Sequence, residues 1–268
     1  MPYVFSGAER TWYQGQENGQ WSNSMPWSTI APQTKTIAGV TCRVYKAATE
    51  TAKHARAKLE TLKTAIQGLQ AAGLMFTDAD VHKFKVGLYD TGPSRGLVYF
   101  KGATPLPTVV LQLGNRISEH VKAGSLRAAS ATAGGETATP PRVVADRVYD
   151  YYKAAKFISP KDKCQLAQAY HELGHIMHQL NSPSEYILNA DCASGNMATA
   201  AHTNRSNQLA QVVAEGKAHV SQYAGTTGDL KSLNEYVAEV FAGIMMGVDW
   251  DVVDVAGNVM AQYTALGG

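Results

Sequence analysis

The chain has 268 residues, of which 45% are hydrophobic and 17% are charged, and its formal net charge is +2. This composition indicates a globular protein with a sizeable core and excludes a largely disordered chain. The near-neutral charge, without a Lys/Arg run, argues against a nucleic-acid partner. No apolar stretch is long enough to span a membrane.

The N-terminus lacks the basic start and apolar run of a signal peptide, and the localisation is left unknown. The three cysteines, Cys42, Cys164 and Cys192, are too few for a disulfide framework. The sequence allows one bridge between Cys164 and Cys192, so cysteine usage does not decide the compartment. The oligomeric state is equally open.

The first third of the chain has two parts. Residues 1–36 are rich in Trp, Tyr, Gly, Gln and Ser without a helical or strand period, which predicts an irregular aromatic arm. Residues 43–72 are strong helix formers with apolar residues at helical spacing, which predicts a long helix that ends at Gly73.

The pattern then changes to short β-rich runs at residues 83–90, 96–102 and 107–114, separated by Gly- and Pro-containing turns. They predict a small, mostly antiparallel sheet. Residues 128–141 are small and polar, as in a loop or a boundary within the domain. From Val143 onward the chain reads as mostly helical, and Ser159 with Pro160 marks a favourable helix start.

The order of these elements predicts an α+β fold. The expected organisation is the arm, 1–36, followed by a single domain, 37–268. Within that domain a helix-and-sheet part, 37–142, precedes a helical part, 143–268.

The stretch YHELGHIMHQL, residues 170–180, carries three histidines on one predicted helix. His171 and His175 are one turn apart, so their imidazoles can converge on one tetrahedral cation. Glu172 follows about 100° round the helix, where a general base would meet a metal-activated water. The apolar residues lie on the opposite side. We therefore expect the histidine side to face a cleft.

His178 lies two turns from His171, about 10 Å along the axis, and is too far away to share its metal. It is either a residue at the outer rim of the site or a polar position near the helix end. The competing interpretation of the whole motif is a pair of structurally satisfied histidines without a metal.

A catalytic zinc needs a third protein ligand. The extension H-x-x-G-x-x-H found in metzincins fails here, because His178 and Asn181 occupy its glycine and last histidine positions. A carboxylate from a second helix is the other solution. Residues 232–243 place Glu235 and Glu239 one turn apart, opposite an apolar stripe.

Other interpretations of these acidic residues stay open. Glu215 is the main rival as the third ligand, and Asp191 is a weaker one. Ser232 and Glu235 have the spacing of a capping box, in which Glu235 would bond to the backbone at the helix start. Glu239 would be a solvated helix residue if the pair has no role in a metal site.

H-E-x-x-H followed by N-E-x-x-A-E resembles the gluzincin branch of the zinc metallopeptidases, whose second motif is N-E-x-x-S-D. The resemblance implies a zincin-like fold and one catalytic Zn²⁺. It implies Glu235 as the third ligand and Glu239 as the carboxylate that orients a zinc-binding histidine. The 60 residues from His175 to Glu235 are a long gap for a gluzincin and require an insertion.

The segment VSQYAGTTGDLKSLNEYVAEVF, residues 220–241, is similar to the Tyr…E-x-x-x-E-x-F arrangement of the anthrax lethal factor type of toxin metallopeptidase. The similarity implies that Tyr223 donates a hydrogen bond to the oxyanion. It also favours a secreted toxin or a delivered effector. Tyr223 precedes Glu235 by 12 residues, more than in that pattern.

We therefore expect a zinc-dependent metalloendopeptidase that acts on a protein or peptide substrate, with Glu172 as general base and Tyr223 as oxyanion donor. Extended substrate would pair with an edge strand, for which residues 108–114 or their neighbour are candidates. The alternative is a non-catalytic zinc-containing binding module, a vestigial metallopeptidase, with the aromatic arm as its functional surface.

Overall fold

The computed structural model describes residues 3–19, 27, 30–74, 77–89, 94–114, 160–195, 198–215, 219–220 and 232–268. The contacts divide the chain into two compact units, Met1–Glu119 and His120–Gly268. This division, like the expected boundary between residues 142 and 143, falls outside the described residues.

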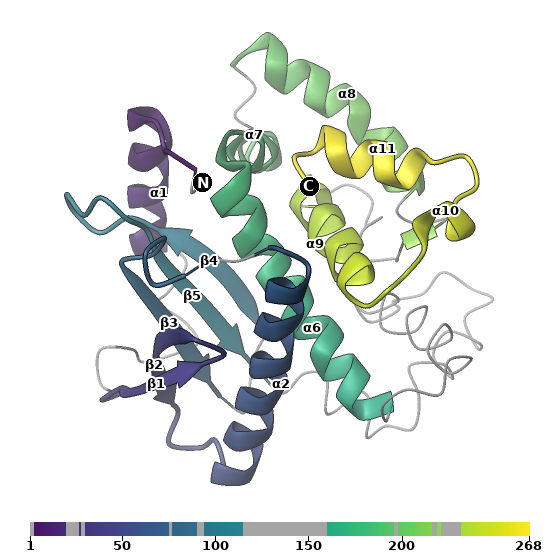
Figure 1. Ribbon diagram of the computed structural model, residues 1–268. Helices are drawn as coiled ribbons and strands as arrows, with labels where there is room; N and C mark the ends of the chain where they lie inside the picture. Colours follow the sequence, from purple (N-terminus) through teal and green to yellow (C-terminus); the bar gives the residue numbers. More distant parts are fainter. Residues whose placement is uncertain are drawn as a thin grey trace. The chain divides into compact units, whose positions relative to one another are not determined.

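The first unit contains a mixed five-stranded sheet in the order β1-β2-β3-β5-β4 (Figure 1). The strands are β1 Gln33–Ile37, β2 Val40–Lys46, β3 Lys83–Leu88, β4 Arg95–Tyr99 and β5 Thr108–Leu113. The three strands expected from the sequence are confirmed as β3, β4 and β5. The expectation of a mostly antiparallel sheet is wrong, because β2–β3 and β3–β5 pair in parallel. A helix connects β2 to β3, and such a crossover returns the chain in the same direction.

The position of β5 also corrects the choice of edge strand. β5 lies between β3 and β4, so its backbone is paired on both sides. The edges of the sheet are β1 and β4, and each pairs with its single neighbour in antiparallel fashion. Strand β5 therefore cannot pair with an extended substrate. Its neighbour β4 lies at an edge and remains a candidate.

Helix α2, Ala52–Ala71, is the crossover between β2 and β3. The helix expected from residue 43 thus begins later, because residues 40–46 form β2, whose side chains alternate between buried and exposed from Val40 to Val44. The Thr51 hydroxyl caps α2 by accepting the backbone N–H of His54 at 3.2 Å. The helix ends before Gly73, as predicted, and this glycine has a φ of +74°.

The N-terminal arm is not irregular throughout, because Gly7–Gly19 form helix α1. A capping box explains its start: the Glu9 carboxylate accepts the backbone N–H of Ser6 at 2.7 Å. The Ser6 hydroxyl accepts that of Glu9 at 3.3 Å. The aromatic residues do pack the arm onto the body, since Phe5 meets Phe100 edge-to-face at 5.0 Å.

The second unit is helical wherever it is described, in agreement with the sequence. Its helices are α6 Pro160–Asn181, α7 Pro183–Ala193, α8 Ala200–Glu215, α9 Ser232–Met245, α10 Trp250–Val253 and α11 Asn258–Ala265. Helix α6 begins at Pro160, as expected, and Ser159 lies outside the described residues. The described residues thus combine helices with a five-stranded sheet, which is compatible with an α+β fold. None of the helices in the described ranges is long and apolar enough to cross a membrane.

Cys192 is a buried free thiol in α7, whereas the side chain of Cys164, to which the sequence allowed a bridge, lies outside what the structure describes. Its sulfur donates to the backbone oxygen of His202 at 3.6 Å. Burial is the main reason that the pKa of this thiol is raised, which keeps the thiol protonated and unreactive.

Helices α6 and α9 pack against each other in the second unit (Figure 1), and Gly174 of α6 lies directly against α9. A Cβ added to Gly174 would lie 3.2 Å from the Cα of Ala238 and 3.0 Å from Cδ1 of Phe241. The glycine inside the H-E-x-x-H motif therefore allows the close approach of the helix that carries Glu235 and Glu239.

We expect Gly174→Ala to lower the Tm by a few degrees. The added methyl group forces α6 and α9 apart, and overpacking costs about 1–3 kcal/mol, more than the roughly 1 kcal/mol that alanine gains over glycine within a helix. Thermal unfolding followed by circular dichroism measures the effect. Gly15→Ala in α1 is the matched control and should raise the Tm, because a Cβ there meets nothing within 4 Å. A stabilised Gly174→Ala variant would contradict the close contact.

Candidate metal centre

The two histidines of the motif lie side by side on α6, with ring centroids 4.9 Å apart and ring planes at 86°. Each points its Nε2 toward α9. The expectation that this side of α6 faces a cleft is corrected in part: His175 and Glu172 are buried, with 8% and 6% of their surfaces exposed. The reason is tertiary, because α9 packs along α6.

Glu235 meets both histidines. Its Oε2 lies 3.1 Å from Nε2 of His171 and 3.1 Å from Nε2 of His175. The carboxylate of Glu239, one turn further along α9, lies 2.7 Å from Nδ1 of His171 through its Oε1. The structure thus brings together His171, His175, Glu235 and Glu239 from two helices that are remote in the sequence. It also places the Glu235 carboxylate on the imidazoles, so helix capping is not its sole contact.

The arrangement fits a tetrahedral metal ion. Zinc binds imidazole nitrogens and carboxylate oxygens at about 2.0–2.1 Å, which places the ligand atoms about 3.3 Å apart. The two distances of 3.1 Å from the Glu235 oxygen to the histidine nitrogens are close to that value. The contact of Glu239 with the outer nitrogen of His171 is the kind that orients a metal-binding imidazole and sets its tautomer.

The electrostatics of the centre favour a cation. Burial alone would lower the pKa of His171, but hydrogen bonds to Glu235 and Glu239 and the negative charge of Glu172 raise this pKa well above 6.5. Burial would raise the pKa of Glu235, yet the neighbouring His175 and His171 hold this pKa well below its usual range. Three carboxylates therefore surround the two imidazoles, and they stabilise positive charge at the centre.

Glu172 lies beside the two histidines, as its position on the helix predicts. One ligand atom from each of His171, Glu172 and His175 lies within 4.8 Å of the other two. The Glu235 oxygen lies 3.1 Å from Nε2 of both imidazoles. Glu235, whose single oxygen bridges the two imidazoles, is the candidate for the third ligand, and Glu172 is a further carboxylate beside the same two histidines.

His178 is a buried residue, with 4% of its surface exposed. Its ring contacts that of Tyr186 edge-to-face at 5.2 Å. Burial and the charge of His175 lower the pKa of His178 to about 3, and the backbone of Leu266 offsets this only in part. The residue is therefore neither at the outer rim nor a solvated position near the helix end. It is a neutral, buried residue that packs against Tyr186.

Tyr186, on α7, is a residue near the centre that the sequence motifs do not reveal. Burial and then the charges of Glu235 and Glu172 raise the pKa of its phenol, so the tyrosine stays protonated beside both carboxylates. Asn234, next to Glu235 in the sequence, donates to the backbone oxygen of Tyr186 at 3.3 Å and links α9 to α7. In the sequence, the asparagine of the N-E-x-x-A-E motif gives the one hint of this contact between α9 and α7.

The rival ligands lie elsewhere among the described residues. Glu215 groups with His219 and Asp254, and Asp191 lies 3.8 Å from Nε2 of His202. These contacts of Glu215 and Asp191 are thus with other histidines than His171 and His175. Tyr223, the expected oxyanion donor, is outside the described residues.

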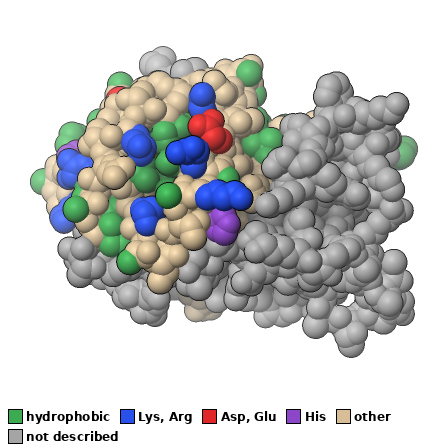
Figure 2. All heavy atoms as spheres, turned by 90° about the horizontal axis from the view of Figure 1, so that it is seen from below, with side chains coloured by type: hydrophobic (Ala, Val, Ile, Leu, Met, Phe, Trp, Pro, Cys, Tyr) green, Lys and Arg blue, Asp and Glu red, His purple; other side chains and the backbone are tan. Residues whose placement is uncertain are grey.

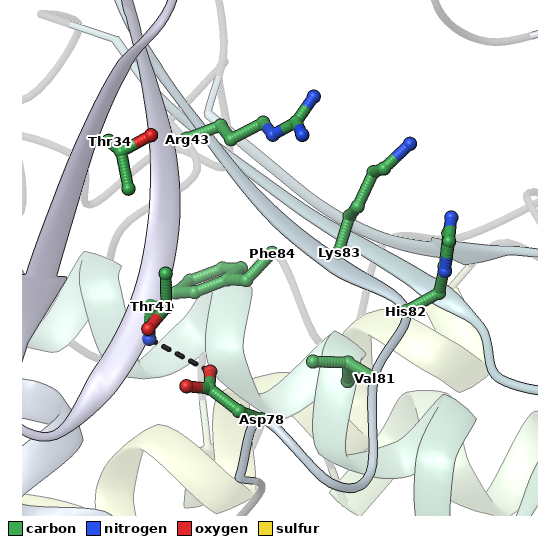
Figure 3. A pocket seen from close by; sticks show the side chains of 8 residues that line it. All are labelled: Thr34, Thr41, Arg43, Asp78, Val81, His82, Lys83 and Phe84. Atoms are coloured by element: carbon green, nitrogen blue, oxygen red, sulfur yellow. Dashed lines mark hydrogen bonds between the residues drawn. The ribbon is translucent and has the colours of Figure 1, made fainter.

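The first unit holds a different kind of site. A pocket of about 380 Å³ opens beside the start of β3, and Figure 3 shows Arg43 and Lys83 extending from neighbouring strands at its rim. Burial and the charges of Arg43, Lys85 and Lys101 lower the pKa of Lys83. Figure 2 shows Lys and Arg side chains gathered on one face of the described residues. The pocket lining combines the cations of Arg43 and Lys83 with the carboxylate of Asp78. Its lining residues are Thr34, Thr41, Arg43, Asp78, Val81, His82, Lys83 and Phe84.

No family model, no curated protein and no solved structure matches this chain. The chemistry of the candidate metal centre is therefore inferred from its own geometry.

Proposed function

We propose that the protein is a zinc-dependent metalloendopeptidase of the gluzincin type with a zincin-like catalytic domain. The observation that carries the proposal is the position of the Glu235 oxygen, 3.1 Å from Nε2 of both His171 and His175. The motif pair H-E-x-x-H and N-E-x-x-A-E supports the same assignment. The ion would be held by these three side chains, which leaves one position open in a tetrahedral site.

Bound Zn²⁺ would supply a Lewis acid that polarises the scissile carbonyl and acidifies a water molecule. The protein's own side chains would transfer the protons and orient the ligands. The Glu172 carboxylate accepts a proton from the attacking water and passes it to the leaving amine. The Glu239 carboxylate, 2.7 Å from Nδ1 of His171, keeps the proton on that nitrogen. Nε2 of His171 is then free of a proton and available as a ligand.

Tyr186 and Tyr223 are the two candidates for a phenol that donates to the oxyanion. Tyr186 is supported by the protonated state that burial and the charges of Glu235 and Glu172 impose on it. Tyr223 is supported by the lethal factor-like motif. A single phenolic donor of this kind is typically worth a factor of about 10²–10³ in kcat.

Digestion of a mixed peptide library tests the activity itself. We expect cleavage at internal peptide bonds, loss of cleavage after dialysis against a chelator, and recovery when zinc is returned. Mass spectrometry of the products identifies the cleaved bonds. The binding-module alternative predicts that a zinc-loaded, folded protein leaves the whole library intact.

Tyr186→Phe is expected to lower kcat by roughly 10²–10³-fold with little change in KM, because the lost hydrogen bond forms only in the transition state. Steady-state kinetics on a peptide found in the library digest measure both constants. Tyr223→Phe is the matched comparison. A large kcat loss in Tyr223→Phe together with full activity in Tyr186→Phe would move the role to Tyr223.

A further inference from the structure

A second group of metal-ligating side chains lies in the second unit, apart from the residues of the candidate metal centre. Glu215 ends α8, His219 follows it, and Asp254 comes directly after α10. Nε2 of His219 lies 3.8 Å from Oε2 of Glu215 and 3.9 Å from Oδ1 of Asp254. One ligand atom from each of the three lies within 4.8 Å of the other two.

Asp254 is the most deeply buried member of this cluster, with only 2% of its surface exposed. Its Oδ2 accepts the backbone N–H of Val259 at 2.7 Å. Its Oδ1 faces the His219 imidazole at 3.9 Å, beyond hydrogen-bond distance. One oxygen of this buried carboxylate is thus held by the backbone, and the other is directed at the His219 imidazole, where a shared cation could bind both side chains.

The charge balance leads in the same direction. Glu215 and Asp254 bring two negative charges together, and the single imidazole of His219 cannot neutralise both. The two negative charges also act on the buried Tyr236. The pKa of its phenol is raised by burial and then by the charges of Glu215 and Asp254. A divalent ion would balance the two carboxylates.

We propose that Glu215, His219 and Asp254 form a second divalent-cation site, which prefers Zn²⁺ to Ca²⁺. One imidazole nitrogen with two carboxylate oxygens is a donor set that suits zinc, whereas calcium requires oxygen ligands alone and more of them. The present separations of 3.8 and 3.9 Å exceed the roughly 3.3 Å expected for bound zinc. The His219 side chain is 34% exposed and would shift when the ion binds.

The ion at this site would connect the end of α8 to the segment between α10 and α11. Its role is structural: it ties together two chain segments that are remote in the sequence and so stabilises the second unit. The proposal does not rest on the proposed function, because the two sets of ligands share no residue.

Zinc stoichiometry tests the second site. Full-length protein is stripped with a chelator, dialysed against micromolar Zn²⁺, and its zinc per chain is measured by mass spectrometry. We expect two ions in the wild type, one in His219→Ala, one in His171→Ala and none in the double variant. We also expect zinc to raise the Tm of His171→Ala by a few degrees, and calcium to raise it less.

The controls separate this proposal from the proposed function. If the His171 centre holds no zinc, the wild type and His171→Ala each bind one ion and His219→Ala binds none, which still supports the second site. Glu215→Gln, which keeps the size of the side chain, must also weaken zinc binding. His54→Ala is the matched control. His54 lies 3.8 Å from Glu50 and follows it by four residues, as His219 follows Glu215. The charge of Glu50 is already paired with Lys58, so this pair should bind no zinc. An unchanged zinc count in folded His219→Ala and Glu215→Gln overturns the second site.

Discussion

Glu172→Gln is expected to reduce peptide cleavage by roughly 10²–10⁴-fold, the contribution of a positioned general base. The amide has the size and shape of the carboxylate but accepts no proton from water. Glu172 is 6% exposed beside the two histidines, so the isosteric change avoids a cavity. The Glu235 oxygen and both imidazoles stay in place, and we expect zinc content and Tm to remain near those of the wild type.

The measurement compares kcat/KM on a peptide substrate with zinc per chain in the same preparation. Glu60→Gln, on the exposed side of α2, is the matched control and should keep full activity. Full activity in zinc-loaded Glu172→Gln would refute its role as the general base. Loss of both zinc and activity would instead make Glu172 a ligand.

Glu235→Ala is expected to remove zinc from the His171–His175 site, because it deletes the oxygen that lies 3.1 Å from both Nε2 atoms. Glu239→Gln should weaken the affinity by a smaller factor of roughly 10–100, as expected for a residue that only orients a ligand. Competition with a chromophoric chelator measures both affinities. Using the His219→Ala background leaves the proposed second site out of the titration.

Comparing the affinity losses of Glu235→Ala and Glu239→Gln shows which carboxylate binds the metal. A larger affinity loss in Glu239→Gln than in Glu235→Ala would exchange their roles. Stoichiometric zinc of unchanged affinity in Glu235→Ala would refute the third ligand and leave helix capping as the function of Glu235. In that case the variant would lose stability without any change in metal binding.

Local periodicity accounts for what could be predicted about the centre. His171 and His175 meet because residues four apart share one face of any α-helix. The same spacing relates Glu235 and Glu239 on α9. The run from Lys83 to Leu88 is rich enough in β-formers to be recognised as a strand. Each of these predictions depends on residues within one or two turns of each other.

Predictions failed where non-local contacts decide the structure. Residues 43–46 suit a helix by spacing, but they form the end of β2 because β3 pairs alongside them. The sheet is mixed because α2 acts as a crossover. His178 looks like a surface position on a helix wheel, yet Tyr186 and the packing of the second unit bury it.

The sequence by itself determined the donor types and their spacing on each helix, because helix geometry is a local property of the backbone. Only the tertiary structure decided which helix faces which. The absence of a side chain at Gly174 allows α9 to approach α6 closely, and that contact places Glu235 rather than Glu215 on the histidines. Glu215 instead joins His219 and Asp254. Its partners are set by packing between distant segments, which no local pattern encodes.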